Sequence, residues 1–387
     1  MQKEILLITN YFPPEKGAAA NRMHSIAENL GKAGYKVKVI CPLPNYPSGE
    51  IFEGYRGKLS ISEKTTFGEV SRLWTWPSNS TNKFIRLLSM LSFSLSLAVF
   101  FIFRKTPKTI FIQYSPVFIG FTAVCLGKIF SKKIILNVSD LWPLAGLEMG
   151  ILNKGFYYTI LLKMERYCYK KSDLIVGQSE EILHHISKLE DKKPLFLYRN
   201  IPNFKVPKIN DRASSKEVKI VYAGLLGVAQ GIFEICEKIT FPQNVSFHIY
   251  GAGPDAERLK SLQSKNVYFY GEVDRAVLHT ELKKYDLAFV PLVNRIYGSV
   301  PSKIFEYTRL GLPILYFAGG EGGKIIAKES LGWVIPVNNT KKLQEFINTV
   351  SENELYTYPK EKVQNIAVSV FNFEKQFKAF ISAIETV

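Results

Sequence analysis

A repeated alternation of short apolar segments with longer amphipathic ones constrains this chain more than any other feature. Residues 5–9 are apolar enough for a buried strand, and residues 36–41 form a second such segment. Between them, residues 18–33 predict a helix that Gly34 ends, with apolar side chains every three or four positions: Met23, Ile26, Ala27 and Leu30. The three segments predict a strand–helix–strand unit whose crossover is long enough to join parallel strands.

The same alternation continues along the chain in two blocks. The first block has further apolar segments at residues 110–114, 134–138, 174–177 and 196–199. A polar stretch at residues 201–219 contains Pro202 and Pro207 and predicts a linker. Apolar segments then resume at residues 219–222, 246–250, 267–270, 287–290 and 314–317. In a chain of 387 residues, this pattern predicts an α/β protein with two Rossmann-like, doubly wound domains.

The composition excludes a mainly disordered chain and indicates the charge of its binding partners. Hydrophobic residues make up 47% and charged residues 22% of the chain, which is enough apolar material for large cores. The formal net charge of +16 indicates anionic partners, which are nucleic acid, nucleotide phosphates or an anionic membrane surface. The four cysteines form no CxxC pair, so we expect neither a zinc site nor a disulfide framework. Cysteines without disulfides indicate that the protein resides in a reducing compartment. The apolar run at residues 5–8 is too short for a secretory signal peptide.

Residues 87–103 interrupt the alternation, because they form a long apolar stretch without a charged side chain. Lys83 and Arg86 precede this stretch, and Arg104 and Lys105 follow it. Three interpretations remain open: a buried helix of the first domain, a helix lying in one leaflet of a membrane, and a membrane-spanning helix. The basic flanks suit anionic headgroups. The stretch is shorter than the roughly 20 residues that a spanning helix usually needs.

The second block contains the sharpest chemical signal, at residues 300–307. Ser302 is a good N-cap residue for a predicted helix that follows a strand. A helix that begins beyond the carboxyl end of a parallel strand offers N–H groups to phosphate, and Lys303 adds a positive charge there. Glu306 lies one turn further, where it can accept hydrogen bonds from a ribose diol. The plainer alternative is that Lys303 and Glu306 are solvated residues in an i,i+3 contact.

An ordered series of short motifs carries a family resemblance. The motifs are Tyr11-Phe12-Pro13-Pro14 with Gly17, Asn21 and Arg22; Cys41-Pro42-Leu43-Pro44-Asn45-Tyr46-Pro47; Ser139-Asp140-Leu141-Trp142-Pro143; Tyr222-Ala223-Gly224; Ala229-Gln230-Gly231; Gly251-Ala252-Gly253-Pro254; Gly271-Glu272-Val273; Pro301-Ser302-Lys303; and Gly311-Leu312-Pro313. Over nearly the whole chain, the series resembles family 4 of the GT-B glycosyltransferases, especially members that assemble bacterial capsule, colanic acid and O-antigen. The resemblance implies the GT-B fold, in which two Rossmann-like domains face a cleft.

The resemblance implies that the second domain binds the donor. Glu306 matches the second glutamate of the family's E-x7-E motif and is expected at the donor ribose, whereas Gly298 replaces the first glutamate. Lys303 and Arg295 are expected to bind the diphosphate. The other expected donor contacts are Ser302, Gly224, Gly251, Gly253, Glu272 and Val273. Two further positions, where the family often carries Arg and Lys, hold Leu225 and Gln230.

The resemblance assigns the acceptor to the first domain. Asp140 is expected to orient the acceptor hydroxyl or act as its base, and the alternative is a helix N-cap before Pro143. Gly17 is expected to let the backbone approach the phosphates or the acceptor, and Asn21 belongs to the same loop. Arg22 is a candidate contact to an acceptor diphosphate, and its alternative is a solvated helix position.

The implied reaction is glycosyl transfer with retention of anomeric configuration. Asp140 and Lys303 are the catalytic candidates, with Lys303 stabilising the nucleoside-diphosphate leaving group of an oxocarbenium-like transition state. No Asp-x-Asp occurs, so we expect no metal ion or other cofactor. The expected donor is a UDP-sugar such as a UDP-N-acetylhexosamine, and the expected acceptor is a polyprenyl-diphosphate-linked saccharide. This acceptor implies a peripheral position on the cytoplasmic face of the plasma membrane, with Lys128, Lys132 and Lys133 adding to the basic surface.

The expected boundaries are residues 1–205 for the acceptor-side domain, 206–365 for the nucleotide-sugar-binding domain and 366–387 for a helix that packs back on the first domain. Two other enzyme classes are alternatives. A UDP-sugar epimerase of GT-B fold would bind the same donor, whereas a nicotinamide oxidoreductase needs a G-x-G-x-x-G motif that residues 10–17 do not match. A non-catalytic nucleotide-binding protein also stays open because of Gly298. No nucleic-acid partner is expected, since no nucleic-acid-binding motif accompanies the charge.

Overall fold

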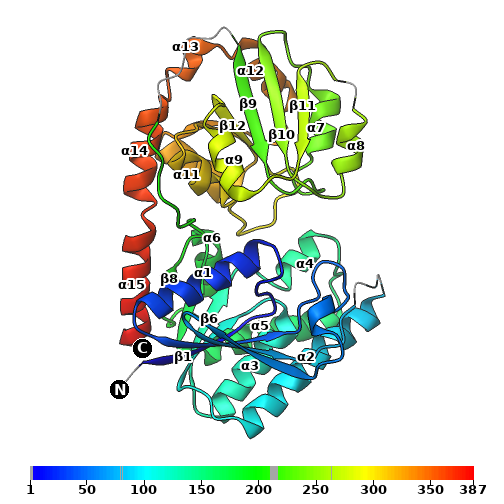
Figure 1. The fold of residues 1–387 in the computed structure, drawn as a ribbon, viewed down its shortest axis with the longest axis vertical. Helices are drawn as coiled ribbons and strands as arrows, with labels where there is room; N and C mark the ends of the chain where they lie inside the picture. Colours follow the sequence, from blue (N-terminus) through cyan, green and yellow to red (C-terminus); the bar gives the residue numbers. More distant parts are fainter. Residues whose placement is uncertain (1–2, 79, 81, 210–216, 263) are drawn as a thin grey trace. The chain divides into compact units, whose positions relative to one another are not determined.

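The structure of the chain is a computed structural model that describes residues 3–78, 80, 82–209, 217–262 and 264–387 (Figure 1). It divides into two compact units, unit 1 with Met1–Arg199 and Lys375–Val387, and unit 2 with Asn200–Glu374. Each unit contains one largely parallel sheet, so the predicted α/β class with two Rossmann-like domains is confirmed. The division falls after Arg199 rather than at residue 205, and the chain returns to unit 1 at Lys375 rather than at residue 366.

The sheet of unit 1 has eight strands in the order β3-β4-β2-β1-β5-β6-β7-β8. Their bounds are β1 Glu4–Ile8, β2 Lys36–Pro42, β3 Ser60–Thr65, β4 Gly68–Leu73, β5 Thr109–Gln113, β6 Lys133–Val138, β7 Leu174–Gly177 and β8 Leu195–Leu197. Only β3 runs antiparallel to its neighbour, β4. This hairpin was not predicted, because β3 is a largely exposed edge strand and its polar sequence lacks the apolar run of a buried strand.

Helices cover both faces of this sheet, with α1 on one face and α2, α3 and α5 on the other (Figure 1). The helices of unit 1 are α1 Ala18–Lys32, α2 Lys83–Phe103, α3 Val117–Ile129, α4 Leu144–Glu148, α5 Phe156–Lys171 and α6 Glu180–Leu189, with a short 3-10 turn, η1, at Glu53–Tyr55. The C-terminal helix α15, Phe373–Thr386, packs on unit 1 through Phe380. The fully buried ring of Phe380 lies 5.9 Å from that of Phe111 and 4.8 Å from that of Tyr198, between ring centroids.

The sheet of unit 2 has six parallel strands in the order β11-β10-β9-β12-β13-β14. They are β9 Val218–Ala223, β10 Val245–Tyr250, β11 Val267–Gly271, β12 Leu287–Pro291, β13 Ile314–Phe317 and β14 Gly332–Ile335. The helices are α7 Ile232–Lys238, α8 Ala256–Lys260, α9 Arg275–Leu282, α10 Lys303–Arg309, α11 Gly320–Lys328, α12 Thr340–Thr349, α13 Glu352–Leu355 and α14 Lys360–Val370. The strand order reverses between β9 and β12, and doubly wound sheets bind ligands beyond the carboxyl ends of the strands at such a point.

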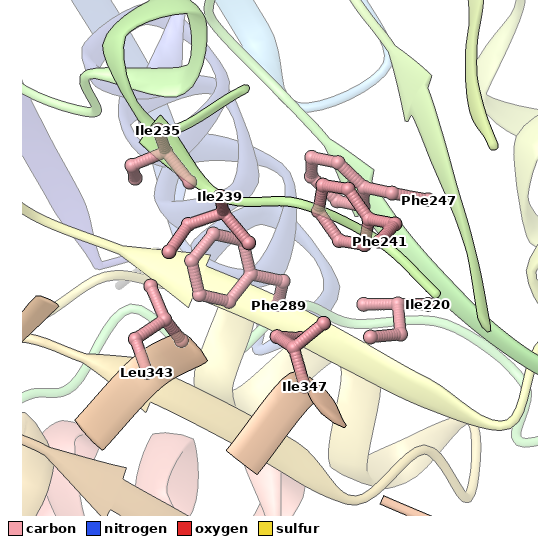
Figure 2. Close-up of a pocket in the computed structure, with 8 residues that line it drawn as sticks. All are labelled: Ile220, Ile235, Ile239, Phe241, Phe247, Phe289, Leu343 and Ile347. Atoms are coloured by element: carbon pink, nitrogen blue, oxygen red, sulfur yellow. The ribbon is translucent and has the colours of Figure 1, made fainter. Parts of the chain in front are cut away.

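The core of unit 2 contains a small cavity that does not suit a ligand (Figure 2). Its volume is about 10 Å³. Only apolar side chains line it, namely Ile220, Ile235, Ile239, Phe241, Phe247, Phe289, Leu343 and Ile347. A cavity needs about 10–15 Å³ and polar partners to hold even one water molecule. This space is therefore a feature of core packing.

The apolar stretch at residues 87–103, for which the sequence allows three interpretations, lies within helix α2. Phe93, Leu97 and Phe101 on one face are buried, whereas Leu95 and Ile102 on the other face are exposed. The helix is therefore buried along one face only, which the first interpretation did not anticipate. Within the part of the chain that the structure describes, no helix combines the length and the apolar character that crossing a bilayer requires.

Candidate functional site

The loops that follow β9, β10 and β11 meet at the carboxyl edge of the unit 2 sheet. The Gly224 N–H donates to the Tyr250 carbonyl at 3.0 Å, and the Gly251 N–H donates to the Gly271 carbonyl at 2.8 Å. Gly251 has φ of +145°, and a Cβ there would lie 1.8 Å from the Gly224 carbonyl oxygen, so only glycine fits. Gly253 approaches the Leu226 backbone in the same way. We call Gly224, Gly251 and Gly253 the glycine cluster. Next to it, Gly271 is followed by the exposed Glu272 and the half-buried Val273.

Lys303 and Glu306 lie beside this glycine cluster. A Cβ placed on Gly224 would be 3.6 Å from Cε of Lys303, and the Lys303 Nζ donates to Oε2 of Glu306 at 3.0 Å. The Glu306 side chain is only 7% exposed, whereas that of Lys303 is 30% exposed. The predicted i,i+3 contact therefore exists, but its carboxylate is buried rather than solvated. The structure thus brings together three of the predicted donor residues at the point where the strand order reverses.

The second oxygen of Glu306 has a partner that sequence reasoning missed. His279 on α9 places Nε2 2.8 Å from Oε1 of Glu306. Because an ionised carboxylate can only accept hydrogen bonds, His279 carries a proton on Nε2 in this contact. His279 and Glu306 are 27 positions apart, so no local spacing pattern in the sequence could have revealed the pair.

Ser302 occupies the predicted N-cap position of helix α10, but its side chain does not cap the helix. Its backbone is already helical, with φ of −60° and ψ of −19°, and its side chain makes no capping hydrogen bond. A capping side chain reaches the helix N–H groups from an extended backbone, which Ser302 does not have. The Ser302 carbonyl instead accepts from the N–H groups of Phe305 and Glu306, both at 3.1 Å.

Arg295 adds a cation further along the same edge of the sheet. Its guanidinium lies against Gly320, at the start of α11, where a Cβ would be 2.0 Å from the Arg295 Cζ. Gly320 has φ of +75° and follows β13, so the positive charge lies close to the carboxyl end of that strand.

In unit 1, Asp140 follows β6 in a loop that several hydrogen bonds hold. Gln178 Nε2 donates to the Ser139 carbonyl at 2.5 Å, and the buried Tyr114 hydroxyl donates to the Trp142 carbonyl at 3.1 Å. The Asp140 carboxylate has no hydrogen-bond partner among the described residues, and burial raises its pKa. Helix α4 has no side-chain cap, so the alternative role of Asp140 as a helix cap is wrong. A carboxylate with a raised pKa on a fixed loop is suited to proton transfer.

The start of α1 presents an open backbone. Gly17 has φ of +145°, and a Cβ there would meet no atom within 4 Å. Asn21 is exposed one turn further, and its N–H donates to the Gly17 carbonyl at 3.0 Å. Gly17 thus lies where the sequence predicts an approachable loop, whereas Asn21 lies in the first turn of α1 and not in the loop.

Arg22 differs from both predicted roles. It is only 5% exposed, so it is neither a solvated helix residue nor open to an acceptor diphosphate. Its Nη2 donates to Oδ1 of Asn137 and to the Tyr198 carbonyl, both at 3.0 Å. Burial lowers the pKa of Arg22 to about 10. Its role in the structure is to join α1 to the ends of β6 and β8.

Comparisons with known proteins agree with this fold. Residues 217–353 match the family described as "Glycosyl transferases group 1". The probable glycosyltransferase WbjE of Pseudomonas aeruginosa is 26% identical over 244 residues, which span 58% of this chain and 61% of WbjE. The sucrose-phosphate synthase of Thermosynechococcus elongatus superposes with a TM-score of 0.77 at 15% identity, over 99% of this chain and 98% of its own. The chain has the fold of the GT-B glycosyltransferases and is related to them.

A further solved structure with this GT-B fold is that of Anabaena HepE, whose complex with UDP-glucose superposes with a TM-score of 0.67 at 11% identity, over 99% of this chain and 100% of its own. At these identities, the solved structures show the fold alone. The predicted resemblance to GT-B glycosyltransferases is confirmed, and membership of family 4 stays a prediction. The family match covers most of unit 2 and includes the glycine cluster, Lys303 and Glu306.

Proposed function

We propose that the chain is a retaining glycosyltransferase that moves a sugar from a UDP-sugar, such as a UDP-N-acetylhexosamine, to a polyprenyl-diphosphate-linked saccharide. The observation that carries this proposal is the position of Lys303, which lies beside Gly224 and donates to Glu306 at the reversal point of the unit 2 sheet. The relationship to the probable glycosyltransferase WbjE and the UDP-glucose complex of HepE support a nucleotide-sugar donor.

In this proposal, unit 2 supplies the groups that bind the donor. Phosphate oxygens approach the glycine cluster, where the missing side chains leave backbone groups accessible. Lys303 stabilises the negative charge that develops on the leaving diphosphate, and Arg295 adds a second cation. The ribose hydroxyls donate to Glu306. These protein cations make a metal ion unnecessary for charge compensation, so we propose a reaction without metal or other cofactor.

Unit 1 supplies the acceptor side of the proposal. Asp140 orients the acceptor hydroxyl or takes its proton, because its carboxylate is unpaired among the described residues and its pKa is raised by burial. Gly17 and Asn21 lie at an open helix start that suits the phosphate groups of the acceptor.

Binding and turnover experiments test the donor site. UDP, UDP-N-acetylglucosamine, GDP and NAD are titrated by calorimetry into the wild-type protein and into Lys303→Gln and Glu306→Gln. We expect UDP compounds to bind best, and each substitution to weaken binding about tenfold or more, since charge-assisted hydrogen bonds are the strong ones. The matched controls are Lys260→Gln and Glu257→Gln, from an exposed i,i+3 ion pair of the same unit, which should bind like the wild type.

The outcomes separate the competing functions. Transfer of labelled sugar to a polyprenyl-diphosphate-linked acceptor supports the transferase. Conversion of the UDP-sugar to its epimer without any acceptor indicates a GT-B epimerase instead. Binding without either reaction indicates a non-catalytic nucleotide-binding protein. Salt-sensitive binding of a short DNA duplex, without binding of any nucleotide, would indicate a nucleic-acid-binding protein, as the net charge of +16 alone would suggest.

We further propose that unit 1 binds the cytoplasmic surface of the plasma membrane through the outer faces of α2, α3 and α5. These faces carry exposed apolar side chains at Leu91, Leu95, Ile102, Phe103, Ile129 and Phe156. Arg104 and Lys105 are exposed at the end of α2 and suit anionic headgroups. Of the other predicted lysines, Lys128 pairs with Asp173 at 3.2 Å and Lys132 donates to the Thr106 carbonyl at 2.8 Å, so these two are already engaged.

Vesicle binding tests this surface. The wild-type protein should sediment with vesicles that contain phosphatidylglycerol and much less with phosphatidylcholine alone. Leu95→Glu and Ile102→Glu should weaken binding at least fivefold, since burying such a side chain contributes about 1.5–3 kcal/mol. Val370→Glu, at a position of unit 2 that is 47% exposed, is the control. Equal binding by all variants would exclude this surface.

A further inference from the structure

The carboxylate of Glu306 is held from two sides in unequal ways. His279 contacts Oε1 with a side chain that is 20% exposed, and Lys303 contacts Oε2 with one that is 30% exposed. The Lys303 contact is an i,i+3 pair within one short helix, and Lys303 is the more exposed of the two partners. The His279 contact joins two different helices, α9 and α10. Of the two partners, Lys303 is therefore the one that a ligand displaces more easily.

The imidazole of His279 is in turn fixed by an aromatic neighbour. The ring of Phe204 lies 4.8 Å from that of His279, between centroids. On α10, Arg309 lies with its Cζ 4.8 Å from the Phe204 centroid and donates to the Phe204 carbonyl at 3.3 Å. Arg309 also donates to the Pro202 carbonyl. Phe204, in a segment that the sequence predicts to be plain linker, thus packs against the ring that holds Glu306.

We propose that His279 is a positioning residue, which keeps Oε1 of Glu306 occupied and thereby presents Oε2 to the ribose of the donor. The inference rests on the proposed function, because it requires a nucleoside-diphosphate donor. When the diphosphate binds, Lys303 moves from Oε2 to the phosphate oxygens, and Oε2 then accepts a hydrogen bond from a ribose hydroxyl. The ribose is thus recognised fully only when a diphosphate is attached to it.

This arrangement has a physical advantage for selectivity. A carboxylate that is held at one oxygen loses less conformational freedom when the other oxygen binds a hydroxyl. Because Lys303 leaves Oε2 only for another anion, a nucleoside without phosphates competes with an intact ion pair and binds poorly. The site therefore discriminates against free nucleosides as well as against deoxyribose.

The test compares UDP with 2′-deoxy-UDP by calorimetry. In the wild type, loss of the hydroxyl should weaken binding about tenfold, as expected for a hydrogen bond to a charged group. His279→Leu should reduce this ratio to about twofold or less while affinity for 2′-deoxy-UDP stays nearly unchanged. His279→Gln keeps a side-chain N–H donor and should restore most of the ratio. Glu306→Gln removes the carboxylate and should abolish the ratio.

The outcomes separate this inference from the proposed function. If His279→Leu weakens UDP and 2′-deoxy-UDP equally, His279 has only a structural role and the inference is wrong. If His279→Leu does not fold, the variants His279→Gln and Phe204→Leu test the positioning role instead. The role is contradicted if the ratio of UDP affinity to 2′-deoxy-UDP affinity is lost in His279→Gln and unchanged in Phe204→Leu. If the wild type binds no uridine nucleotide at all, it is the proposed function that fails.

Discussion

The guanidinium of Arg22 lies over the ring of Tyr198, with 4.9 Å from Cζ to the ring centroid, and also donates to the Tyr198 carbonyl at 3.0 Å. A cation–π contact and two hydrogen bonds thus compensate in part for burying a full charge, which is costly without partners. Two atoms of the same group, Nε and Nη1, are buried without a hydrogen-bond partner among the described residues. Arg22 is therefore a structural residue of unit 1, and the burial of its charge is only partly compensated by its contacts.

The first prediction concerns stability at this position. Arg22→Ala should lower the free energy of unfolding by about 2–4 kcal/mol, because it leaves a cavity and removes the donor to Asn137 and Tyr198. Arg22→Lys should also destabilise, since a point charge cannot reproduce the guanidinium fork. Urea unfolding followed by circular dichroism measures both. A change within about 0.5 kcal/mol for both variants would be typical of a solvated position and would contradict the buried role.

The second prediction concerns Asp140 and the pH. Burial raises the pKa of Asp140 above its ordinary value of 3.8. A carboxyl with a raised pKa in the folded state stabilises the fold at low pH and loses that contribution as the pH rises through the raised pKa. Asp140→Asn should therefore be more stable than the wild type at pH 7, and the difference should shrink towards pH 3.8.

Activity should move in the opposite direction at Asp140. If this carboxylate is the base, Asp140→Asn should lower kcat by about 10²–10⁴-fold, the usual size of general-base catalysis. The wild-type kcat/KM should fall as the pH drops through the raised pKa. Asp191→Asn, at an exposed aspartate of unit 1, is the control and should change neither quantity. Loss of both stability and activity in Asp140→Asn would indicate a structural carboxylate instead.

The sequence predicted the alternating architecture well because a buried parallel strand requires an apolar run and a covering helix requires apolar residues every three or four positions. The polar edge strand β3 was not predicted for the same reason, because none of its side chains is buried and its sequence therefore has no apolar run. At the candidate donor site, the types and order of residues sufficed to predict that Gly224, Lys303 and Glu306 lie together.

What the sequence could not provide was backbone conformation and long-range contact. Ser302 has the right chemistry for a cap but a helical backbone, which local sequence does not reveal. The contact between His279 and Glu306 depends on how α9 and α10 pack. The burial of Arg22 depends on partners at Asn137 and Tyr198, far along the chain. Each failure is a case in which tertiary packing decides what a side chain does.

The third prediction concerns Glu15, which ties two loops of unit 1 together. This buried carboxylate accepts from the N–H groups of Asn45 at 2.8 Å and Tyr46 at 2.9 Å, and from that of Phe12 at 3.3 Å. Glu15→Ala leaves these donors without their acceptor and should cost about 1–3 kcal/mol of unfolding free energy. It should also speed protease cleavage within residues 45–50.

A glutamate from the same region provides the control for Glu15. The Glu50 side chain is 75% exposed and forms an ion pair with Arg56 at 3.4 Å. Exposed ion pairs contribute about 0–1 kcal/mol, so Glu50→Ala should hardly change stability or cleavage. Equal effects of the two substitutions would mean that the hydrogen bonds of Glu15 do not hold the loops.

The fourth prediction concerns His248, which lies among aromatic rings in unit 2. Its ring stacks on those of Tyr268 at 5.0 Å and Tyr270 at 5.8 Å, and Nδ1 lies 2.9 Å from the Tyr270 hydroxyl. Burial, reinforced by the nearby charge of Lys219 and opposed by that of Glu217, lowers the pKa of His248 from 6.5 to about 4. The folded protein therefore keeps this histidine neutral at a pH where the unfolded chain binds a proton.

The sign of the resulting pH dependence follows from this difference. Between pH 6.5 and about 4 the unfolded state binds more protons, so the free energy of unfolding should fall as the pH falls through this range. His248→Phe keeps the stacked ring and removes the titrating group, so it should flatten this slope even though losing the hydrogen bonds lowers its stability at pH 7. Urea unfolding across this pH range measures the slope. His184→Gln, at an exposed histidine, should leave the wild-type slope intact, and an equally steep slope in His248→Phe would show that His248 is not its source.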